Sequence, residues 1–267
     1  TRKIAPALAA GCTVVLKPAA ETPLTALAIA TLLQRAGLPD GVVNVIPTTR
    51  AGDVVSSWLG DQRVRKLSFT GSTGVGRHLL RQAADRVINS SMELGGSAPL
   101  IVADDADLSV AVAGATVAKL RNGGQACTAA NRFFVHRSIA PAFIERFTTA
   151  VRDLTVGPAP EGHPVGPMIS AQAVQKLSSL VDDALAGGAK VVFRSDVPPT
   201  AHGHFFPVTV LTDLPAHAAI LEQEIFGPVT TVTTWDDETQ LVNEVNSSEL
   251  GLAAYVFSRD LQRALQI

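Results

Sequence analysis

Two residues in this chain, Cys127 and Glu93, are of types that together can carry out covalent catalysis. Cys127 ends a run rich in glycine, asparagine and glutamine at residues 122–127, and Glu93 lies just before Gly95 and Gly96. A thiol can act as a nucleophile, and a carboxylate can take a proton from water. Small residues before the thiol let a ligand approach backbone N–H groups that can stabilise an oxyanion. We therefore predict that Cys127 is a nucleophile and that Glu93, on a second short loop, is a base.

A second set of residues favours a phosphate-bearing ligand. The segment Gly71-Ser-Thr-Gly-Val-Gly76 follows a β-rich run and opens a helical pattern. N–H groups at such a helix start bind phosphate, although the glycine spacing differs from the usual dinucleotide fingerprint. Lys17 follows another β-rich run, and parallel sheets bind ligands at the carboxyl ends of their strands. The pattern predicts a nucleotide site at Lys17, Gly71 and Ser72; the alternative is a glycine-rich helix start without a ligand.

Alternating strands and helices must position these candidates. In the first third, strands are predicted at 12–16, 42–46 and 66–69, and helices at 24–36, 51–59 and 71–84. Later strands are predicted at 99–102, 132–135, 190–193, 207–211 and 229–235, and later helices at 108–120, 140–154 and 171–186. This alternation is typical of an α/β fold with a parallel, doubly wound sheet. We predict two α/β units, residues 1–95 and 96–267.

The composition is that of an ordinary globular protein. The 267 residues are 46% hydrophobic and 17% charged, with a formal net charge of −2, which is enough chain for one large or two modest domains. The near-neutral charge gives no electrostatic reason to expect nucleic acid or an anionic membrane as a partner. No apolar run reaches membrane-spanning length. We expect a small molecule as the ligand.

The cysteines and histidines predict neither a disulfide nor a metal site. Two cysteines make no disulfide framework, and Cys12 lies in an apolar run where a thiol usually packs as a small hydrophobe. Only His202 and His204 lie close together, with no third ligand nearby in the sequence. A reducing, cytoplasmic compartment suits free thiols. Both ends of the chain fall inside helical patterns, so we expect an internal segment of a longer protein, whose start is no guide to targeting.

Six short strings resemble the aldehyde dehydrogenase family, in the family's order and over essentially the whole chain. They are Ala9-Ala-Gly-Cys-Thr-Val-Val-Leu-Lys-Pro18, Phe69-Thr-Gly-Ser-Thr73, Glu93-Leu-Gly-Gly96, Gly124-Gln-Ala-Cys127, Glu224-Ile-Phe-Gly-Pro228 and Gly251-Leu-Ala-Ala254. The resemblance implies a truncated α/β fold with a Rossmann-like parallel-sheet cofactor domain, of which 1–95 is part. Residues 96–267 would be part of the catalytic domain that carries the nucleophile.

The resemblance also implies a role for each candidate residue. Cys127 would form a thiohemiacetal with an aldehyde and then a thioester, and Glu93 would activate the water that hydrolyses it. NAD or NADP would be the cofactor. The residues implied to contact it are Lys17 at the adenosine ribose, Gly71 and Ser72 at the pyrophosphate, Glu224 at the nicotinamide ribose, and Phe226 near the ring.

The chain departs from the family at one informative place and lacks two of its segments. NAD-preferring members often carry Glu three residues after the lysine, where this chain has Ala20. Without that carboxylate a 2′-phosphate is not repelled, so we favour NADP, while the adjacent Glu21 leaves NAD open. The asparagine that donates to the oxyanion in this family would precede Thr1. A C-terminal segment that completes the substrate pocket and supports homo-oligomers would follow Ile267.

Within the family, the chain most resembles the succinate-semialdehyde dehydrogenases. Arg2 and Arg121 match the arginines that hold the distal carboxylate of the substrate there. Two guanidinium groups can grip a carboxylate and so place the aldehyde at the thiol. The alternatives are that Arg121 merely caps a helix and that the substrate is glutarate semialdehyde, one methylene longer.

Two other function classes are open at this point. A cysteine hydrolase or acyltransferase would use Cys127 and Glu93 but would leave Lys17 and Glu224 unexplained, and no histidine lies in an evident motif to serve as its base. A non-catalytic scaffold would keep the fold without the activity, which the presence of both Cys127 and Glu93 disfavours.

Overall fold

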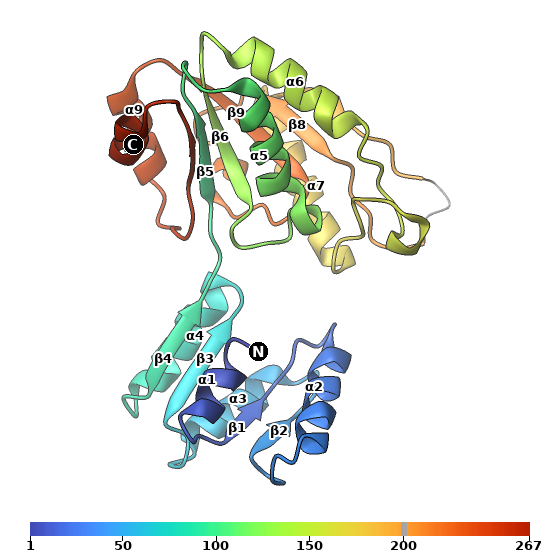
Figure 1. Ribbon diagram of the computed structural model, residues 1–267, viewed down its shortest axis with the longest axis vertical. Helices are drawn as coiled ribbons and strands as arrows, with labels where there is room; N and C mark the ends of the chain where they lie inside the picture. Colours follow the sequence, from blue (N-terminus) through green and yellow to red (C-terminus); the bar gives the residue numbers. More distant parts are fainter. Residues whose placement is uncertain (199–201) are drawn as a thin grey trace. The chain divides into compact units, whose positions relative to one another are not determined.

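The computed structural model describes residues 1–198 and 202–267 (Figure 1). Backbone contacts divide the chain into two compact parts, unit 1 at Thr1–Leu94 and unit 2 at Gly95–Ile267. Within the described residues, no helix has the length and apolar character needed to cross a membrane. In the same residues, no group of three or more His, Cys, Asp or Glu side chains could hold a metal ion.

Unit 1 alternates helices and strands, as predicted. Its elements are α1 (Ile4–Ala9), β1 (Val14–Leu16), α2 (Pro23–Arg35), β2 (Val43–Val45), α3 (Ala51–Gly60), β3 (Lys66–Thr70), α4 (Thr73–Ala84) and β4 (Asn89–Glu93). The predicted parallel arrangement is confirmed, because β1 pairs with β2 and β3 with β4, both in parallel. Among the described residues, however, these are two separate two-stranded sheets and not one continuous sheet.

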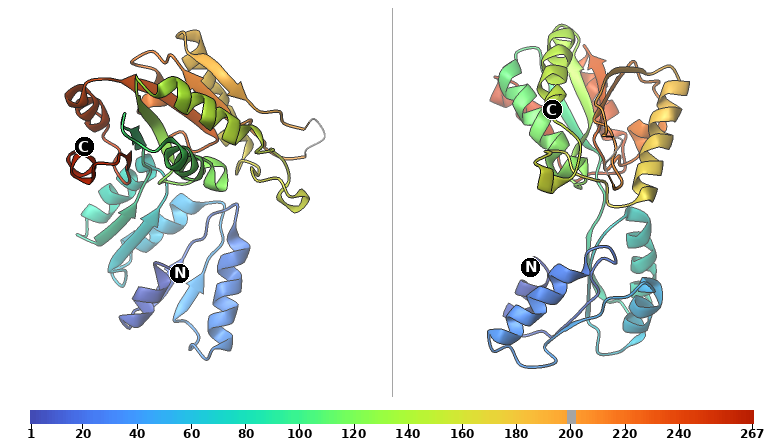
Figure 2. Two further views of the ribbon diagram at one scale, coloured as in Figure 1. Left: turned by 45° about the horizontal axis from the view of Figure 1, so that its top comes forward. Right: turned by 90° about the vertical axis from the view of Figure 1, so that its right-hand side faces the viewer.

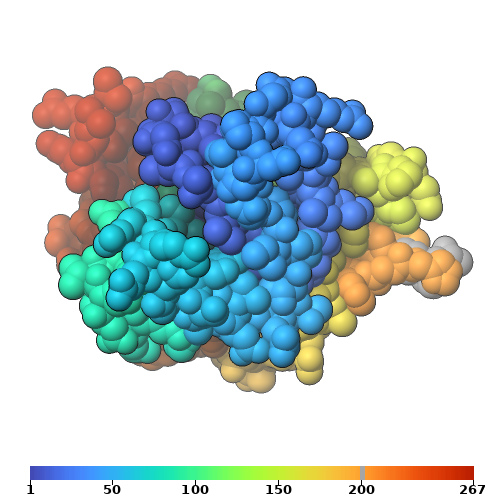
Figure 3. All heavy atoms as spheres, turned by 90° about the horizontal axis from the view of Figure 1, so that it is seen from below, coloured from blue at the N-terminus to red at the C-terminus, as the bar shows by residue number. Residues whose placement is uncertain are grey.

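Hydrogen bonds donated by side chains connect segments of unit 1 that are far apart in the sequence and lie against each other in Figure 3. The amine of Lys3 donates to the hydroxyl of Thr70, so the segment before α1 is attached to the end of β3. The guanidinium of Arg86 donates to the carbonyls of Leu59, at 2.9 Å, and Asp61, at 2.5 Å. The chain after α4 is thereby fixed to the end of α3.

Unit 2 contains one six-stranded sheet covered by helices on both faces (Figure 2). Its strands are β5 (Ala98–Val102), β6 (Ala130–His136), β7 (Lys190–Arg194), β8 (Thr209–Thr212), β9 (Val229–Trp235) and β10 (Tyr255–Phe257). Its helices are α5 (Leu108–Leu120), η1 (Arg121–Gly124), α6 (Ala140–Arg152), η2 (Ala159–Glu161), α7 (Ala171–Ala186), α8 (Ala219–Glu222), α9 (Glu238–Asn246) and α10 (Leu261–Gln266). The strand order is β10-β5-β6-β9-β8-β7, and among the strands of the described residues only β7 runs antiparallel to its neighbour.

The apolar side chains of the central strands alternate between two cores. Leu100 and Phe133 face α5 and α6, where they join the phenylalanines of α6 at positions 143 and 147. Ile101 and Phe134 point the other way and pack with Leu241 of α9. Because both faces are covered, all five residues of β5 are buried, which explains its uninterrupted apolar sequence.

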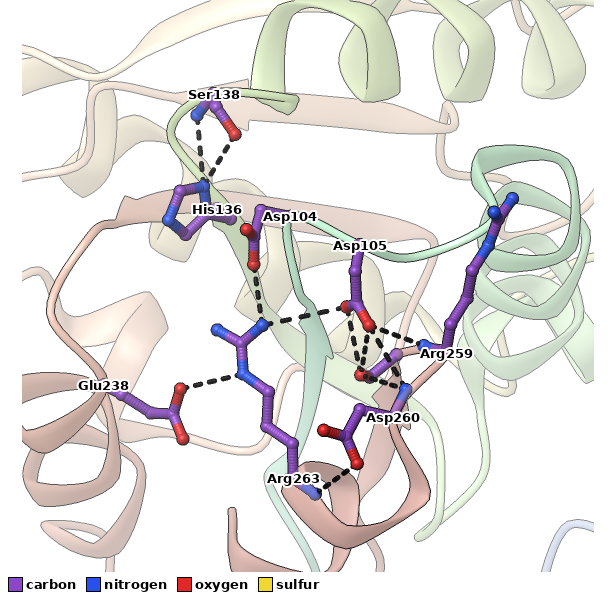
Figure 4. Close-up of polar contacts among 9 residues, drawn as sticks. Asp104, Asp105, His136, Ser138, Glu238, Arg259, Asp260 and Arg263 are labelled. Carbon is purple, nitrogen blue, oxygen red and sulfur yellow. Dashed lines mark hydrogen bonds and ion pairs between the residues drawn. The ribbon is translucent and has the colours of Figure 1, made fainter.

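The C-terminal helix α10 is held by a network of ionic contacts around Arg263 (Figure 4). Its guanidinium contacts Asp104 at 2.7 Å and Glu238 at 2.9 Å, and it lies over the Trp235 ring. Asp105 accepts hydrogen bonds from the Ser258 hydroxyl and from the N–H groups of residues 259 and 260. Together these contacts fix α10 to the end of β5 and to α9.

Candidate active site

The loop that carries Cys127 begins with an unusual backbone. Asn122, Gly123 and Gly124 have φ values of +56°, +62° and +77°. Glycine adopts this left-handed region without a steric penalty, and asparagine tolerates it better than most residues. The three residues turn the chain away from the axis of α5, and the Cys127 side chain that follows is exposed. The thiol therefore lies outside the hydrophobic core, as a nucleophile requires.

Gln125 attaches this loop to a distant segment. Its side-chain amide donates to the Pro167 carbonyl at 3.2 Å, and its side-chain oxygen accepts from the Ile169 N–H at 2.9 Å. Asn122 donates to the carbonyl of Gln125 at 3.0 Å. Both polar side chains form hydrogen bonds within the protein. These bonds account for the presence of asparagine and glutamine in the loop.

The Cys127 loop also packs on the loop that carries Glu224 and Phe226. A Cβ atom added to Gly124 would collide with the carbonyl oxygen of Gly227, so the two glycines allow their backbones to touch. Phe226, between Glu224 and Gly227, has a φ of +56° and is 38% exposed. Two of the strings that resemble a known family therefore meet in unit 2.

Glu224 is half-buried, and its surroundings act on it in opposite directions. Burial raises the pKa of the Glu224 carboxyl, while the Gly96 N–H, at 3.2 Å from Oε1, and Lys176 oppose that rise. The Lys176 amine donates to the Glu224 backbone carbonyl at 2.6 Å, and burial lowers the pKa of Lys176. The carboxylate is thus held at a defined place, with one oxygen on a backbone donor.

Gly96 lies between Cys127 and Glu224. While its N–H donates to Glu224, a Cβ atom added to it would lie 2.5 Å from the Cys127 carbonyl oxygen. Only a residue without a side chain fits there, because real Cβ atoms do not approach backbone oxygens so closely. Gly96 therefore contacts both the loop that carries Cys127 and the Glu224 carboxylate.

A groove of about 870 Å³ runs along α5 beside the thiol loop. Ala126 and Thr128, which flank Cys127, line it together with the aromatic rings of Tyr255 and Phe257. Arg121 supplies the charge at this largely apolar surface. The Tyr255 hydroxyl donates to the Thr128 carbonyl at 2.7 Å and so attaches strand β10 to the loop.

The candidates of unit 1 lie at the carboxyl ends of its strands, as predicted. Lys17 directly follows β1, and its amine donates to the Pro18 carbonyl at 2.6 Å. Gly71 follows β3 and donates its N–H to the Glu93 carbonyl at 3.1 Å, while the Ser72 hydroxyl caps α4 by accepting from the Val75 N–H.

Two expectations about unit 1 need correction. Glu93 is the last residue of strand β4, paired with Thr70, and not part of a loop, because the polar segment 89–93 is drawn into a ladder with β3. Arg2 lies in an exposed turn before α1 and not within a helix that begins at residue 2. Ala20 lies in an exposed turn before α2.

Comparison with known proteins decides what these motifs belong to. The profile of the aldehyde dehydrogenase family matches residues 1–267. This chain belongs to the aldehyde dehydrogenase family. A succinate-semialdehyde dehydrogenase of Paenarthrobacter nicotinovorans is 49% identical over 268 residues, covering 100% of this chain and 59% of that protein. A glutarate-semialdehyde dehydrogenase of Pseudomonas putida is 45% identical, covering 100% of this chain and 55% of that protein.

A solved structure carries the same fold. The crystal structure of an NADP-dependent enzyme of Escherichia coli superposes with a TM-score of 0.96 at 45% identity, covering 99% of this chain and 55% of that chain. The predicted α/β fold of the aldehyde dehydrogenase type is therefore confirmed. The chain spans only 55–59% of the length of these relatives, which fits the expected truncation.

Three further residues of this aldehyde dehydrogenase chain, none of them predicted, are connected to the candidate site by hydrogen bonds, directly or through one another. Lys176 lies in α7 and reaches the Glu224 backbone across 48 positions of sequence. Lys119 and Asn131 are buried and form a hydrogen bond with each other at 3.4 Å. No local pattern identifies Lys176, but a lysine at the end of the apolar helix α5 was a visible anomaly in the sequence.

Proposed function

We propose that the whole protein oxidises a semialdehyde acid with NAD or NADP as hydride acceptor, and that succinate semialdehyde is the substrate. The observation that carries this is an exposed thiol on a left-handed loop that packs against Gly96 and the Glu224 loop, in a chain of the aldehyde dehydrogenase family. A cytoplasmic homo-oligomer belongs to the same proposal, on the family resemblance alone.

The residues present fit a dinucleotide. Helix α4 has twelve residues, and its start follows a parallel strand at Gly71 and Ser72, an arrangement that suits a pyrophosphate. The Glu224 carboxylate, with one oxygen on a backbone N–H, has a further acceptor for a ribose hydroxyl. Lys17, Ala20 and Phe226 complete the proposed cofactor set. When bound, the oxidised nicotinamide accepts a hydride from the substrate carbon.

Cys127 performs the first covalent step. Its thiolate attacks the aldehyde carbon, a C–S bond forms, and the carbonyl oxygen becomes an alkoxide. Backbone N–H groups of the thiol loop stabilise that alkoxide, and the thiohemiacetal carbon then gives up its hydride and becomes a thioester. The fixed loop backbone matters because orientation of the reacting atoms lowers the barrier.

Glu93 performs the second step. Its carboxylate takes a proton from water, and the oxygen of that water attacks the thioester carbon. The C–S bond breaks, the carboxylic acid leaves, and Cys127 is returned as a thiolate. Glu93 then releases its proton to solvent. The exposed position of Glu93 at the end of β4 leaves its side chain open to water.

The proposal that the substrate is an aldehyde acid depends on two arginines that could bind its carboxylate. Arg121 is exposed and lines the groove beside Cys127, where it can meet the distal carboxylate of a short acid. We propose that Arg2 contributes a second guanidinium. The relatives named for succinate and for glutarate semialdehyde are of similar identity, and a groove discriminates weakly over one methylene. Steady-state kinetics with succinate and glutarate semialdehyde test the choice between them.

The cofactor we favour is NADP. Ala20 places no carboxylate where it would repel a 2′-phosphate, and Lys17 offers a nearby positive charge. The Escherichia coli enzyme with the same fold is described as NADP-dependent. A higher kcat/KM with NADP than with NAD is the expected result.

Reduced-cofactor absorbance tests the function. The whole protein is supplied with succinate semialdehyde and with NADP or NAD, and a rise in absorbance is expected with at least one of them. Cys127→Ala should abolish this rise and leave cofactor binding measured by calorimetry nearly unchanged. Cys12→Ala, the matched control at the second exposed thiol, should retain activity. No rise with either cofactor, or a normal rate in Cys127→Ala, would refute the proposal, and hydrolysis without nicotinamide would favour a cysteine hydrolase.

A further inference from the structure

Unit 2 buries an amine that the proposed reaction does not use. Lys119, in the last turn of α5, has no measurable exposure to solvent. Its Nζ donates to Asn131 Oδ1 at 3.4 Å. Burying an amine with so little hydrogen bonding costs stability, and an apolar side chain of similar length would avoid that cost. Its presence at this place therefore needs an explanation beyond packing.

Asn131, which accepts the hydrogen bond from Lys119, in turn donates one to Gly96. It lies in β6 beside α5 (Figure 1) and is 2% exposed. Its Nδ2 donates to the Gly96 carbonyl at 3.4 Å, while its own backbone carbonyl accepts from the Thr231 hydroxyl at 2.9 Å. The amide can be oriented in only one way, because a lysine amine needs an acceptor and a carbonyl needs a donor.

Gly96, at the end of this chain of hydrogen bonds, contacts both candidate residues of unit 2. Its N–H holds Glu224 Oε1 at 3.2 Å, and its backbone lies against the Cys127 carbonyl. The Gly96 N–H belongs to the peptide between residues 95 and 96 and its carbonyl to the next peptide, and the Gly96 Cα joins the two. A shift of Gly96 would therefore move the Glu224 contact and the support of the Cys127 loop together.

We propose that Lys119 and Asn131 are positioning residues for this active site: the amine orients the Asn131 amide, and the amide holds the Gly96 carbonyl and so the position of Gly96, which supports Cys127 and Glu224. The proposal rests on the proposed function, because positioning has a catalytic meaning only if Cys127 is the nucleophile. It assigns to Lys119 a hydrogen-bond donor role and requires no net charge on the amine.

Three substitutions in the whole protein separate the links of this chain. Lys119→Met keeps the length of the side chain and removes the donor. Lys119→Gln keeps a donor without the amine and should rescue the function that Met loses. Asn131→Asp keeps an oxygen toward Lys119 but replaces the donor toward Gly96 with a second oxygen. Lys190→Met, at an exposed ion pair with Asp213, is the matched control.

The kinetic expectation is a loss in kcat. Lys119→Met and Asn131→Asp should each lower kcat for succinate semialdehyde about tenfold or more, with KM for the aldehyde within about twofold, because misplacement affects the reacting atoms more than binding. Lys119→Gln and Lys190→Met should stay within about twofold of the unchanged protein. Melting curves by circular dichroism show whether each variant is folded at the assay temperature.

A second readout does not depend on the substrate. The rate at which iodoacetamide alkylates Cys127, relative to exposed Cys12 in the same chain, is measured by peptide mass spectrometry. That ratio should change by about threefold or more in Lys119→Met and Asn131→Asp and stay near its original value in the other two variants. This readout stands even if no semialdehyde is oxidised, so failure of the proposed function is distinguishable from failure of the positioning role.

Three results would overturn the positioning role. The first is unchanged kcat and alkylation ratio in folded Lys119→Met and Asn131→Asp. The second is a Gln variant no better than the Met variant. The third is a loss of activity that merely follows a lowered melting temperature, since that would make Lys119 a structural residue.

Discussion

Arg121 lies at the junction between helix α5 and the thiol loop and gives the groove beside Cys127 its positive charge. Its side chain is exposed, so a carboxylate can reach it from solvent. It also stands at the C-cap of α5, where a cation is favourable for the helix alone. A comparison of charged and neutral substrates separates the two roles.

Arg121→Ala should raise KM for succinate semialdehyde by about tenfold or more, because a charge-assisted hydrogen bond to the carboxylate is lost. For a neutral aldehyde of similar length, KM should change by less than about twofold. Steady-state kinetics on both substrates measure this difference. Arg137→Ala, which removes an exposed ion pair with Asp236, serves as control. Equal effects on both aldehydes would reduce Arg121 to a helix cap.

Lys119 should make stability depend on pH. Burial lowers the pKa of Lys119 to about 7 from an ordinary value of 10.5. Between these values the unfolded chain binds more protons than the folded one, so the free energy of unfolding rises with pH, by at most about 1.4 kcal/mol per unit. Lys119→Met lacks this contribution to the pH dependence of the free energy of unfolding. Denaturant unfolding at several pH values should show Lys119→Met as the more stable form near neutrality, with the difference shrinking toward pH 10.5. A constant difference would contradict the burial of a neutral amine.

At the scale of elements, the thiol loop depends on close contact between two backbones. Gly124→Ala places a methyl group at φ +77° and against the Gly227 carbonyl, whereas Gly162→Ala, at φ +86°, meets nothing within 4 Å. The left-handed backbone costs each variant about 1 kcal/mol, and overpacking adds about 1–3 kcal/mol only at Gly124. Denaturant unfolding and kcat test this. Gly124→Ala should lose both stability and activity, and Gly162→Ala should lose little activity; equal losses would mean that the loop contact is unimportant.

The network of ionic contacts around Arg263 should weaken in acid. The hydrogen bond from Arg263 holds the pKa of Asp104 below its usual value, so the stabilisation is present above about pH 3.8 and is lost as the pH falls through the lowered pKa. Arg263→Met should lower the melting temperature by about 2–4 °C at neutral pH, as expected for partly exposed ion pairs. The difference in melting temperature between Arg263→Met and the unchanged protein should shrink as the pH falls below the usual pKa of an aspartate. Arg137→Met is the matched exposed control, and a gap that persists in acid would show that the network contributes by packing alone.

How far the sequence could predict these elements depended on whether local patterns fixed them. Helices α5 and α7 were predicted at their observed bounds, because their apolar residues recur with helical spacing between clear end signals. Strand β4, with the polar sequence Asn-Ser-Ser-Met-Glu, was missed, since it is a strand only through pairing with β3. Strand β10 has three residues, too few for a periodicity to be visible.

The same limit applies to the candidate site. Motif strings identified the loops of Cys127 and Glu224, but not the contact between Gly124 and Gly227, which joins residues about a hundred positions apart. The hydrogen bonds from Lys119 through Asn131 to Gly96 were equally invisible, because they depend on the register of β5 and β6. Residue types can thus be recognised locally, whereas their mutual positions are properties of the sheet.

At the scale of the whole molecule, the two units differ in how much of their apolar surface is buried. In unit 1, α2 has no buried residue, and its Leu24 and Leu32 are 76% and 61% exposed. Strands β1 and β2 of the same unit have three residues each. In unit 2, by contrast, β5 and nearly all of β6 are buried between helices. Since buried apolar area is the main source of stability, the 267-residue chain should not be uniformly stable.

Hydrogen exchange measured by mass spectrometry on this 267-residue chain should reveal that difference. Amides of β1, β2 and α2 should exchange early, because little buried apolar surface opposes their local opening. Amides of β5 and β6 should exchange last, and only on global unfolding of unit 2. Adding NADP should slow exchange at the start of α4 if Gly71 and Ser72 bind the pyrophosphate, since a ligand stabilises the state that binds it. Equal protection of α2 and β5 would contradict the burial argument, whereas unchanged exchange at α4 with NADP at saturating concentration would count against the cofactor residues of unit 1 alone.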